Sequence, residues 1–186
     1  MAAARDQIIE VMCTLLETQG YHATGLNQII KESGTPKGSL YYYFPNGKEE
    51  LAAEAIEHVS KLVAERIRLN LSTSDDVSEA VSTFIEKIAD GVEASGAKAG
   101  GPLMIVAMET ATTNELLNLA CREAYGLLQS AFEHKLLASG IQQMRAQQLA
   151  VFILSCVEGA IILSRTQHSG EPLRIVAQEL KQLLAD

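Results

Sequence analysis

Residues 35–44, TPKGSLYYYF, place on one face of a short predicted helix the kinds of side chain that contact nucleic acids. The chain has five tyrosines and no tryptophan, yet three tyrosines are consecutive here. At about 100° per residue, Leu40 and Phe44 share one face of the helix, and Tyr42 points away from that face. A glycine lies one turn before Tyr42 on the outward side, with a serine beside it. The outward stripe therefore combines a missing side chain, a hydroxyl group and an aromatic ring.

This stripe could bring hydroxyl donors to DNA phosphates or base edges. Gly38 would let the helix backbone approach a groove closely, although a glycine inside a helix costs about 1 kcal/mol relative to alanine. The hydroxyls of Ser39, Tyr41, Tyr42 and Tyr43 are the expected donors. The alternative is that this edge packs on a neighbouring helix, with the tyrosines filling the space. A merely solvated face would normally carry Glu, Lys or Gln.

Cations and free N–H groups flank the stripe. Lys37 lies at the N-terminal end of the same helix. Lys48 lies in the first turn of the next helix, where the dipole disfavours a cation unless a phosphate binds there as well. Thr24 and Gly25 begin the preceding helix and offer a hydroxyl and the first N–H groups to another phosphate. Each position also has an ordinary interpretation as a helix cap or a solvated lysine.

The elements that must position these residues are predicted to be helices with glycine-bearing turns. Gly20 is expected to end the first helix, Thr35 to cap the third and Asn46, with Glu49, to cap the fourth. We predict helices at about residues 5–19, 26–33, 36–44, 48–69, 77–92, 103–110, 114–139, 144–166 and 172–184, and a loop at 95–102. No strand signal is found, so the predicted fold class is all-α, and its first three helices follow the helix-turn-helix plan.

Composition limits the kind of DNA contact that is possible. The net charge is −8 over 186 residues and the pI is about 5.0, so any DNA-binding surface has to be local. The three cysteines are scattered, as expected for reduced thiols in the cytoplasm, and the first residues lack a signal-peptide pattern. Residues 149–164 are apolar but too short for a membrane span and contain Glu158, so we expect a buried helix and no membrane.

Residues 20–51, GYHATGLNQIIKESGTPKGSLYYYFPNGKEEL, resemble the DNA-binding domain of the TetR family of bacterial transcriptional regulators, and especially its LmrA/YxaF-like subgroup. The resemblance implies that residues 36–44 form the recognition helix in the major groove. It implies phosphate or base contacts at Thr24, Lys37, Gly38, Ser39, Tyr41, Tyr42, Tyr43 and Lys48. Many relatives have a histidine in place of Tyr43, and the N-terminal arm holds only one cation, Arg5. The implied domains are 1–47 for DNA binding and 48–186 for ligand binding and dimerisation.

Residues 100–132 also resemble the ligand domain of the subgroup. Soft and aromatic side chains suit a lipophilic pocket. The candidate ligand-binding residues are Met104, Met108, Glu109, Tyr125, Phe152 and Cys156. The alternative is an ordinary bundle core, with the glutamate exposed or paired. A redox switch of Cys121 and Cys156 is not favoured, because no neighbouring basic residue is visible to lower a thiol pKa.

The last two predicted helices are apolar over too much of their circumference for helices packed on one side. In the family these helices pair with their symmetry mates, which implies a homodimer that places two recognition helices about one DNA turn apart. The predicted function is a ligand-responsive regulator, expected to be a repressor, which binds a palindromic DNA operator and is released by a small lipophilic or aromatic effector. The alternative is a helical ligand-binding or scaffold protein without an operator. No enzyme motif is found, and we expect neither metal nor cofactor.

Overall fold

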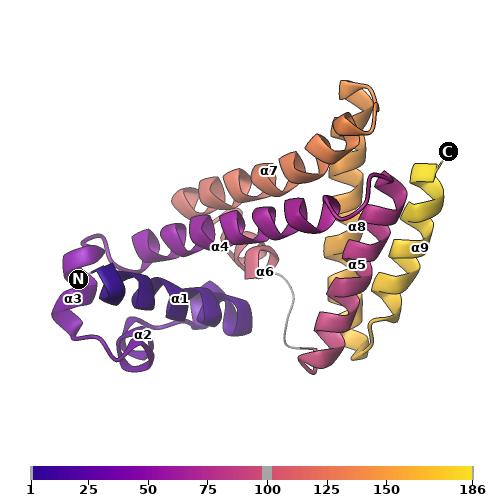
Figure 1. Ribbon diagram of the computed structural model, residues 1–186. Helices are drawn as coiled ribbons and strands as arrows, with labels where there is room; N and C mark the ends of the chain where they lie inside the picture. Colours follow the sequence, from indigo (N-terminus) through magenta and orange to yellow (C-terminus); the bar gives the residue numbers. More distant parts are fainter. Residues whose placement is uncertain (1, 98–101, 186) are drawn as a thin grey trace. The chain divides into compact units, whose positions relative to one another are not determined.

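The computed structural model describes residues 2–97 and 102–185, and within these ranges the chain is all-helical, without a strand (Figure 1). The predicted all-α class is therefore confirmed, and each predicted helix is present. The helices are α1 (Ala2–Ala23), α2 (Leu26–Ser33), α3 (Lys37–Tyr43), α4 (Lys48–Leu71), α5 (Val77–Ala94), α6 (Pro102–Thr110), α7 (Glu115–Ala138), α8 (Gln143–Gln167) and α9 (Glu171–Ala185). The predicted loop at 95–102 falls largely outside the described residues.

Gly20 interrupts α1, as predicted. Its φ of 77° and ψ of −176° are not helical, and one further turn continues beyond this kink to Ala23. The positive φ is easily reached by glycine, which has no Cβ to clash with the backbone. The α1 axis thus changes direction immediately before α2.

The predicted cap of α3 is wrong. The N-cap residue is Pro36, and no side chain caps this helix start. Thr35 is buried, and its hydroxyl lies 2.8 Å from the Ser33 hydroxyl, within hydrogen-bond distance. The threonine oxygen therefore stabilises the turn between α2 and α3 instead of the first turn of α3.

The start of α4 also differs from the prediction, because the carboxylate that reaches back belongs to Glu50. The Asn46 N–H donates to Glu50 Oε2 at 2.8 Å. Gly47, with φ 79°, separates Asn46 from the first helical residue, so the third helical position is Glu50. Glu49 instead accepts from Asn114 Nδ2 at 2.9 Å.

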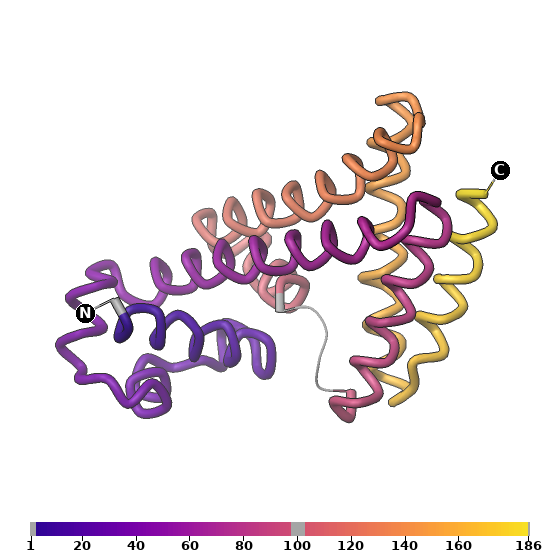
Figure 2. The backbone as a smooth tube through the Cα atoms, in the orientation of Figure 1, coloured from indigo at the N-terminus to yellow at the C-terminus, as the bar shows by residue number. Residues whose placement is uncertain are grey.

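The chain forms two compact units, Met1–Lys61 with Pro102–Tyr125 and Leu62–Gly101 with Gly126–Asp186. In the first unit α1 packs against α2, α3 and α6 around a buried apolar core. In the second unit α9 runs along α5 and α8 (Figure 2). The rings of Phe84 and Phe132 lie 6.0 Å apart in this unit. The functional division between residues 47 and 48 stays a prediction.

The apolar stretch predicted to be a buried helix lies in α8. Among the described residues, α8 is long and apolar enough to cross a membrane, by length and composition alone. Of its most apolar window, 44% is buried inside the protein, so the predicted buried helix is only partly buried.

Candidate nucleic-acid interface

Two buried side chains fix the orientation of α3. Leu40 and Phe44 are both 0% exposed, so the core holds one face of this short helix. Tyr42 consequently points outward and is 74% exposed. The predicted core and outward faces of the helix are therefore confirmed, since helical periodicity fixes one face once the other is buried.

The other two tyrosines extend this outward surface. Tyr41 is 44% exposed, and Lys37 Nζ lies 5.9 Å from the centre of its ring. The rings of Tyr42 and Tyr43 meet edge to face, with centroids 5.0 Å apart. Successive tyrosines thus form a continuous aromatic surface with a cation at its N-terminal end.

Gly38 lies on this surface, and no contact among the described residues requires a glycine there. A Cβ built on Gly38 would have no heavy atom within 4 Å outside the helix backbone, and the residue is exposed. Ser39 beside it is half-buried. Since glycine lowers helix stability, its presence in α3 has no explanation from internal packing.

Lys48 lies against an aromatic ring. Its Nζ is 4.0 Å from the centre of the Tyr21 ring, a distance suited to a cation–π contact. Burial lowers the pKa of the Lys48 ammonium, and the negative charge of Glu109 opposes this shift. Tyr21 belongs to the candidate interface through this contact, and the sequence did not predict it. Its only local signal was its position directly after the glycine that ends the straight part of α1.

Thr24 and Gly25 lie at the start of α2 but differ in what they can offer. The Thr24 side chain is 2% exposed, and its hydroxyl donates to the Gly20 carbonyl at 2.6 Å. Gly25 is the exposed N-cap of α2, and no side chain caps this helix start. The hydroxyl proton of Thr24 is thus used inside the chain, whereas an anion could approach the first N–H groups of α2.

Arg5, the cation of the N-terminal arm, is held within the first unit. It forms an ion pair with Glu54, and its guanidinium lies 5.7 Å from the centre of the Phe44 ring. Its charge is partly neutralised in this position.

The predicted ligand-binding residues of α6 and α7 have mixed environments. Met104 and Tyr125 are half-buried, whereas Met108 is 77% exposed. The Glu109 carboxylate accepts from the backbone N–H groups of Tyr21 and His22. Its Oε2 atom is therefore engaged within the first unit.

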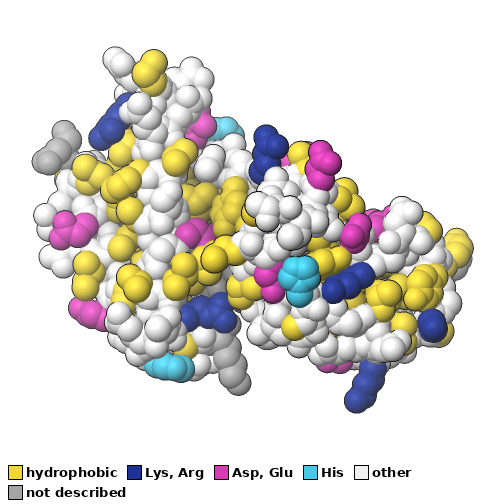
Figure 3. Space-filling model, turned by 180° about the vertical axis from the view of Figure 1, so that it is seen from behind, with side chains coloured by type: hydrophobic (Ala, Val, Ile, Leu, Met, Phe, Trp, Pro, Cys, Tyr) yellow, Lys and Arg dark blue, Asp and Glu magenta, His cyan; other side chains and the backbone are white. Residues whose placement is uncertain are grey.

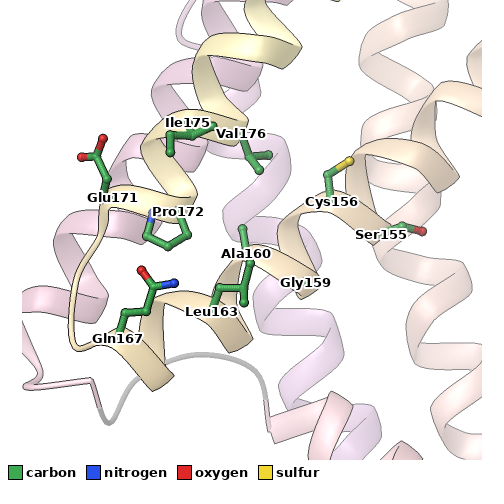
Figure 4. A pocket seen from close by; sticks show the side chains of 10 residues that line it. All are labelled: Ser155, Cys156, Gly159, Ala160, Leu163, Gln167, Glu171, Pro172, Ile175 and Val176. Atoms are coloured by element: carbon green, nitrogen blue, oxygen red, sulfur yellow. The ribbon is translucent and has the colours of Figure 1, made fainter.

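The two candidates on α8 lie on its outer side. Phe152 is 49% exposed, and Cys156 lines an apolar groove of about 460 Å³ between α8 and α9. Figure 4 shows this groove, where Leu163 of α8 faces Pro172 and Ile175 of α9.

Burial also raises the pKa values of the cysteine thiols and of one glutamate. Burial raises the pKa values of the Cys13 and Cys121 thiols to about 11, and it also raises that of Cys156. Protonated thiols are poor nucleophiles, which does not favour a redox switch. Burial raises the pKa of Glu158 to about 7, and its buried Oε2 has no hydrogen-bond partner. The described residues contain no cluster of three His, Cys, Asp or Glu side chains that could hold a metal ion.

Comparison with known proteins assigns both parts of the chain. Residues 8–55 match the family model of bacterial regulatory proteins of the tetR family. Residues 77–179 match the model of the C-terminal domain of LmrA/YxaF-like transcriptional regulators. The second match alone covers more than half of the chain.

Two relatives from Bacillus subtilis (strain 168) match over nearly the full length. The uncharacterized HTH-type transcriptional regulator YxaF is 41% identical over 97% of this chain and 95% of its own. The HTH-type transcriptional regulator LmrA is 36% identical over 97% of this chain and 96% of its own.

Solved structures share the fold at lower identity. A TetR transcriptional regulator from Legionella pneumophila gives a TM-score of 0.81 at 21% identity, and each chain is covered to 95%. The reduced form of NemR from E. coli gives a TM-score of 0.84 at 18% identity, and each chain is covered to 96%. Such regulators are not enzymes, as was predicted for this chain. The chain therefore belongs to the TetR family of bacterial regulatory proteins, in its LmrA/YxaF-like group, and is a helix-turn-helix transcriptional regulator.

Proposed function

We propose that this regulator is a cytoplasmic repressor that binds a palindromic operator as a homodimer and is released by a small lipophilic or aromatic effector. The observation that carries the DNA-binding part is the outward face of α3. There an exposed glycine, for which internal packing gives no reason, stands one turn before a tyrosine that is 74% exposed. A helix backbone that must lie close to a groove benefits from such a glycine.

In this proposal, contacts to the operator divide into two classes. Gly38, Ser39 and the three tyrosines Tyr41–Tyr43 meet the major groove and its edges, with Lys37 close to a phosphate. Lys48 and the N–H groups that follow Gly25 bind phosphates on either side. Thr24 contributes by holding the backbone ahead of Gly25, because its hydroxyl already donates to Gly20.

A second copy of the chain fits the outer face of α8 and α9. Hydrophobic side chains gather on this face in Figure 3. The exposed large hydrophobic residues of these two helices include Val151, Phe152, Leu163, Ile175 and Leu183. Exposed apolar surface of this kind marks an interaction site, and the groove between the two helices lies within it. Two-fold pairing would place the two α3 helices on half-sites about 34 Å apart.

The effector is expected to be apolar, because the candidate ligand-binding residues include soft and aromatic side chains. Met104 and Tyr125, both half-buried, are the candidates best placed to become further covered by a ligand. Met108, Glu109, Phe152 and Cys156 complete the proposed set, although Phe152 also belongs to the proposed dimer face and Cys156 lines the groove within it. An effector that binds better to the DNA-free state of the dimer would shift the population away from the DNA-bound state.

The rival function is a ligand-binding scaffold that does not bind an operator. Gly38 and Lys37 favour the repressor, because a scaffold would have no use for an exposed helix glycine beside a cation. The test is a Gly38→Ala variant, assayed by mobility shift on DNA from beside the protein's own coding region.

We expect Gly38→Ala to raise the free energy of unfolding by about 0.4–1 kcal/mol, because alanine fits the helix and restricts the unfolded chain. The same change should weaken operator binding at least tenfold, about 1.4 kcal/mol, because the added methyl group separates the helix from the groove. Gly91→Ala is the matched control, since Gly91 is an exposed helical glycine in α5 with open space around it. Equal operator binding by both variants would remove the α3 face from the interface, and no shift with wild type at low salt would favour the scaffold.

A further inference from the structure

The kink at Gly20 interrupts α1, and the carboxylate of a residue in α6 accepts hydrogen bonds from the two backbone N–H groups that follow the kink. Because Gly20 is not helical, the Tyr21 and His22 N–H groups cannot both bond as in a continuous helix. Glu109 Oε2 accepts from the Tyr21 N–H at 2.6 Å and lies 3.3 Å from the His22 nitrogen. These residues all belong to the first compact unit, although 88 positions separate Tyr21 from Glu109.

The same carboxylate fills the space beside Gly20. A Cβ on Gly20 would lie 2.6 Å from Glu109 Oε1 and 2.8 Å from Oε2. The positive φ of Gly20 independently disfavours any other residue. Position 20 therefore requires a glycine for two reasons: its backbone has a positive φ, and the Glu109 carboxylate occupies the space that a Cβ would need.

The backbone segment held by this carboxylate contacts residues that are proposed to bind or position phosphates. Tyr21 donates its backbone N–H to Glu109, and its ring contacts the Lys48 ammonium, which lies 4.0 Å from the ring centre. The Gly20 carbonyl accepts from the Thr24 hydroxyl at 2.6 Å, and the Thr24 N–H donates to the Tyr21 carbonyl at 3.2 Å. The path from α1 to α2 and the position of Lys48 therefore both depend on the segment that Glu109 holds.

We propose that Glu109 is a positioning residue for DNA binding, which acts by holding the Gly20–His22 backbone and through it Lys48 and the start of α2. The inference rests on the proposed operator binding and concerns a residue that touches no DNA. It also gives Glu109 a role other than the ligand contact expected from the sequence.

A charge effect would have the opposite sign, which makes the proposal testable. A carboxylate near a phosphate-binding lysine repels DNA, so loss of its charge alone should strengthen binding. Loss of the acceptor should instead weaken binding, because two backbone donors lose their partner and the segment becomes mobile. Glu109→Gln removes the charge and keeps an acceptor oxygen, whereas Glu109→Ala removes both.

The experiment compares operator affinity and amide hydrogen exchange in wild type and the variants Glu109→Ala and Glu109→Gln, with Glu115→Ala as a control. Glu115 is an exposed carboxylate in the first turn of α7 in the same unit. We expect Glu109→Ala to weaken operator binding at least fivefold and to speed exchange at Tyr21 and His22 at least tenfold in the DNA-free protein. Glu109→Gln should bind within threefold of wild type, and Glu115→Ala should change neither readout.

Three results would decide against the proposal. Unchanged exchange in Glu109→Ala would show that the carboxylate does not hold the backbone. Tighter binding by both Glu109 variants would show that only its charge matters. Equal binding by wild type and a fast-exchanging Glu109→Ala would exclude the positioning role while leaving the repressor function intact.

Absence of DNA binding by wild type would refute the repressor function, and the exchange data would still test the backbone contact. If Glu109→Ala does not fold, Glu109→Met preserves the length of the side chain and removes its strong acceptor.

Discussion

Leu40 and Tyr42 are two residues apart in α3 and have opposite environments, with exposed fractions of 0% and 74%. This contrast predicts that Tyr42→Ala weakens operator binding strongly and changes the free energy of unfolding by less than about 1 kcal/mol. The expected loss of affinity follows from removal of an outward ring and hydroxyl that the core does not use. Anisotropy titration with a labelled operator and thermal unfolding of the same samples measure the two effects.

Leu40→Ala provides the comparison for this prediction. Deletion of a fully buried leucine side chain costs about 2–5 kcal/mol of stability, through lost burial and the cavity left behind. If Tyr42→Ala destabilises the protein to a similar extent, the ring is part of the core and its proposed DNA contact is wrong.

Lys48 presents a different situation, because its ammonium already lies 4.0 Å from the centre of the Tyr21 ring. A cation on an aromatic ring still has N–H donors for a phosphate, since the ring occupies only one side of it. We expect Lys48→Ala to reduce the slope of log K against log salt by about one unit. Binding measured across a salt series gives the slope. An unchanged slope would limit Lys48 to packing on Tyr21.

At the scale of elements, a charged cluster holds α9 against the end of α5. Arg174 of α9 donates to both oxygens of Glu93, at 2.8 and 2.9 Å, and to Asp90 at 2.8 Å. The Gly170 N–H, in the turn before α9, donates to Glu93 Oε1 at 2.7 Å. These bonds connect two helices that already pack along each other, and so fix the direction in which α9 leaves the turn.

The cluster predicts a pH dependence of stability. The hydrogen bonds from Arg174, and then that from Gly170, lower the pKa of Glu93 from 4.5 to about 2. A carboxyl whose folded pKa is depressed stabilises the protein above its unfolded pKa, and this contribution disappears as the pH falls through the folded value. We expect Glu93→Gln to lower the melting temperature at pH 7, and the difference from wild type to narrow as the pH falls from about 5 toward 2.

Thermal unfolding of both proteins over that pH range measures the difference directly. Comparison of the two proteins at each pH removes the contributions of other carboxylates, such as the Asp76 N-cap, whose pKa is also lowered by its hydrogen bond to the Ser78 hydroxyl. A constant difference from pH 7 to about 2 would show that the Glu93 charge is not the stabilising feature.

At the scale of the whole molecule, the proposed homodimer makes DNA binding depend on a surface remote in sequence from α3. Leu163 is 52% exposed and lines the groove between α8 and α9. We expect Leu163→Glu to convert dimers to monomers, because two glutamates would be buried close to each other in an apolar interface. Operator binding should then become weak even though α3 is unchanged, since both half-sites are needed for affinity.

Sedimentation and mobility shift on the same preparation test this prediction. Leu116→Glu is the control for oligomeric state, because Leu116, at the start of α7, is a leucine of similar exposure, 48%. A dimer that persists in Leu163→Glu would show that the copies pair through another surface.

Much of the fold could be predicted from the sequence because helical periodicity and helix-ending residues act over a few positions. Leu40 and Phe44 were assigned to the core and Tyr42 to the outside from the angle between successive residues, and their exposures agree. Gly20 was likewise identified as a stop, and it has the expected non-helical backbone. The caps were less predictable, because a single residue in a turn changes the register of every later position. Because Gly47 precedes the first helical residue, the capping carboxylate is that of Glu50 and not that of Glu49.

Tertiary structure alone decided the partners of the polar side chains. Lys48 meets Tyr21 across 27 positions, and Glu109 reaches the Tyr21 N–H across 88. Such pairs arise because α4 and α6 pack beside the end of α1, and hydrophobic burial determines that packing without regard to which charges it brings together. The amino-acid sequence by itself therefore determined the helices, the two faces of α3 and the surface proposed to bind DNA. The packing of distant segments decided which polar groups hold that surface in place.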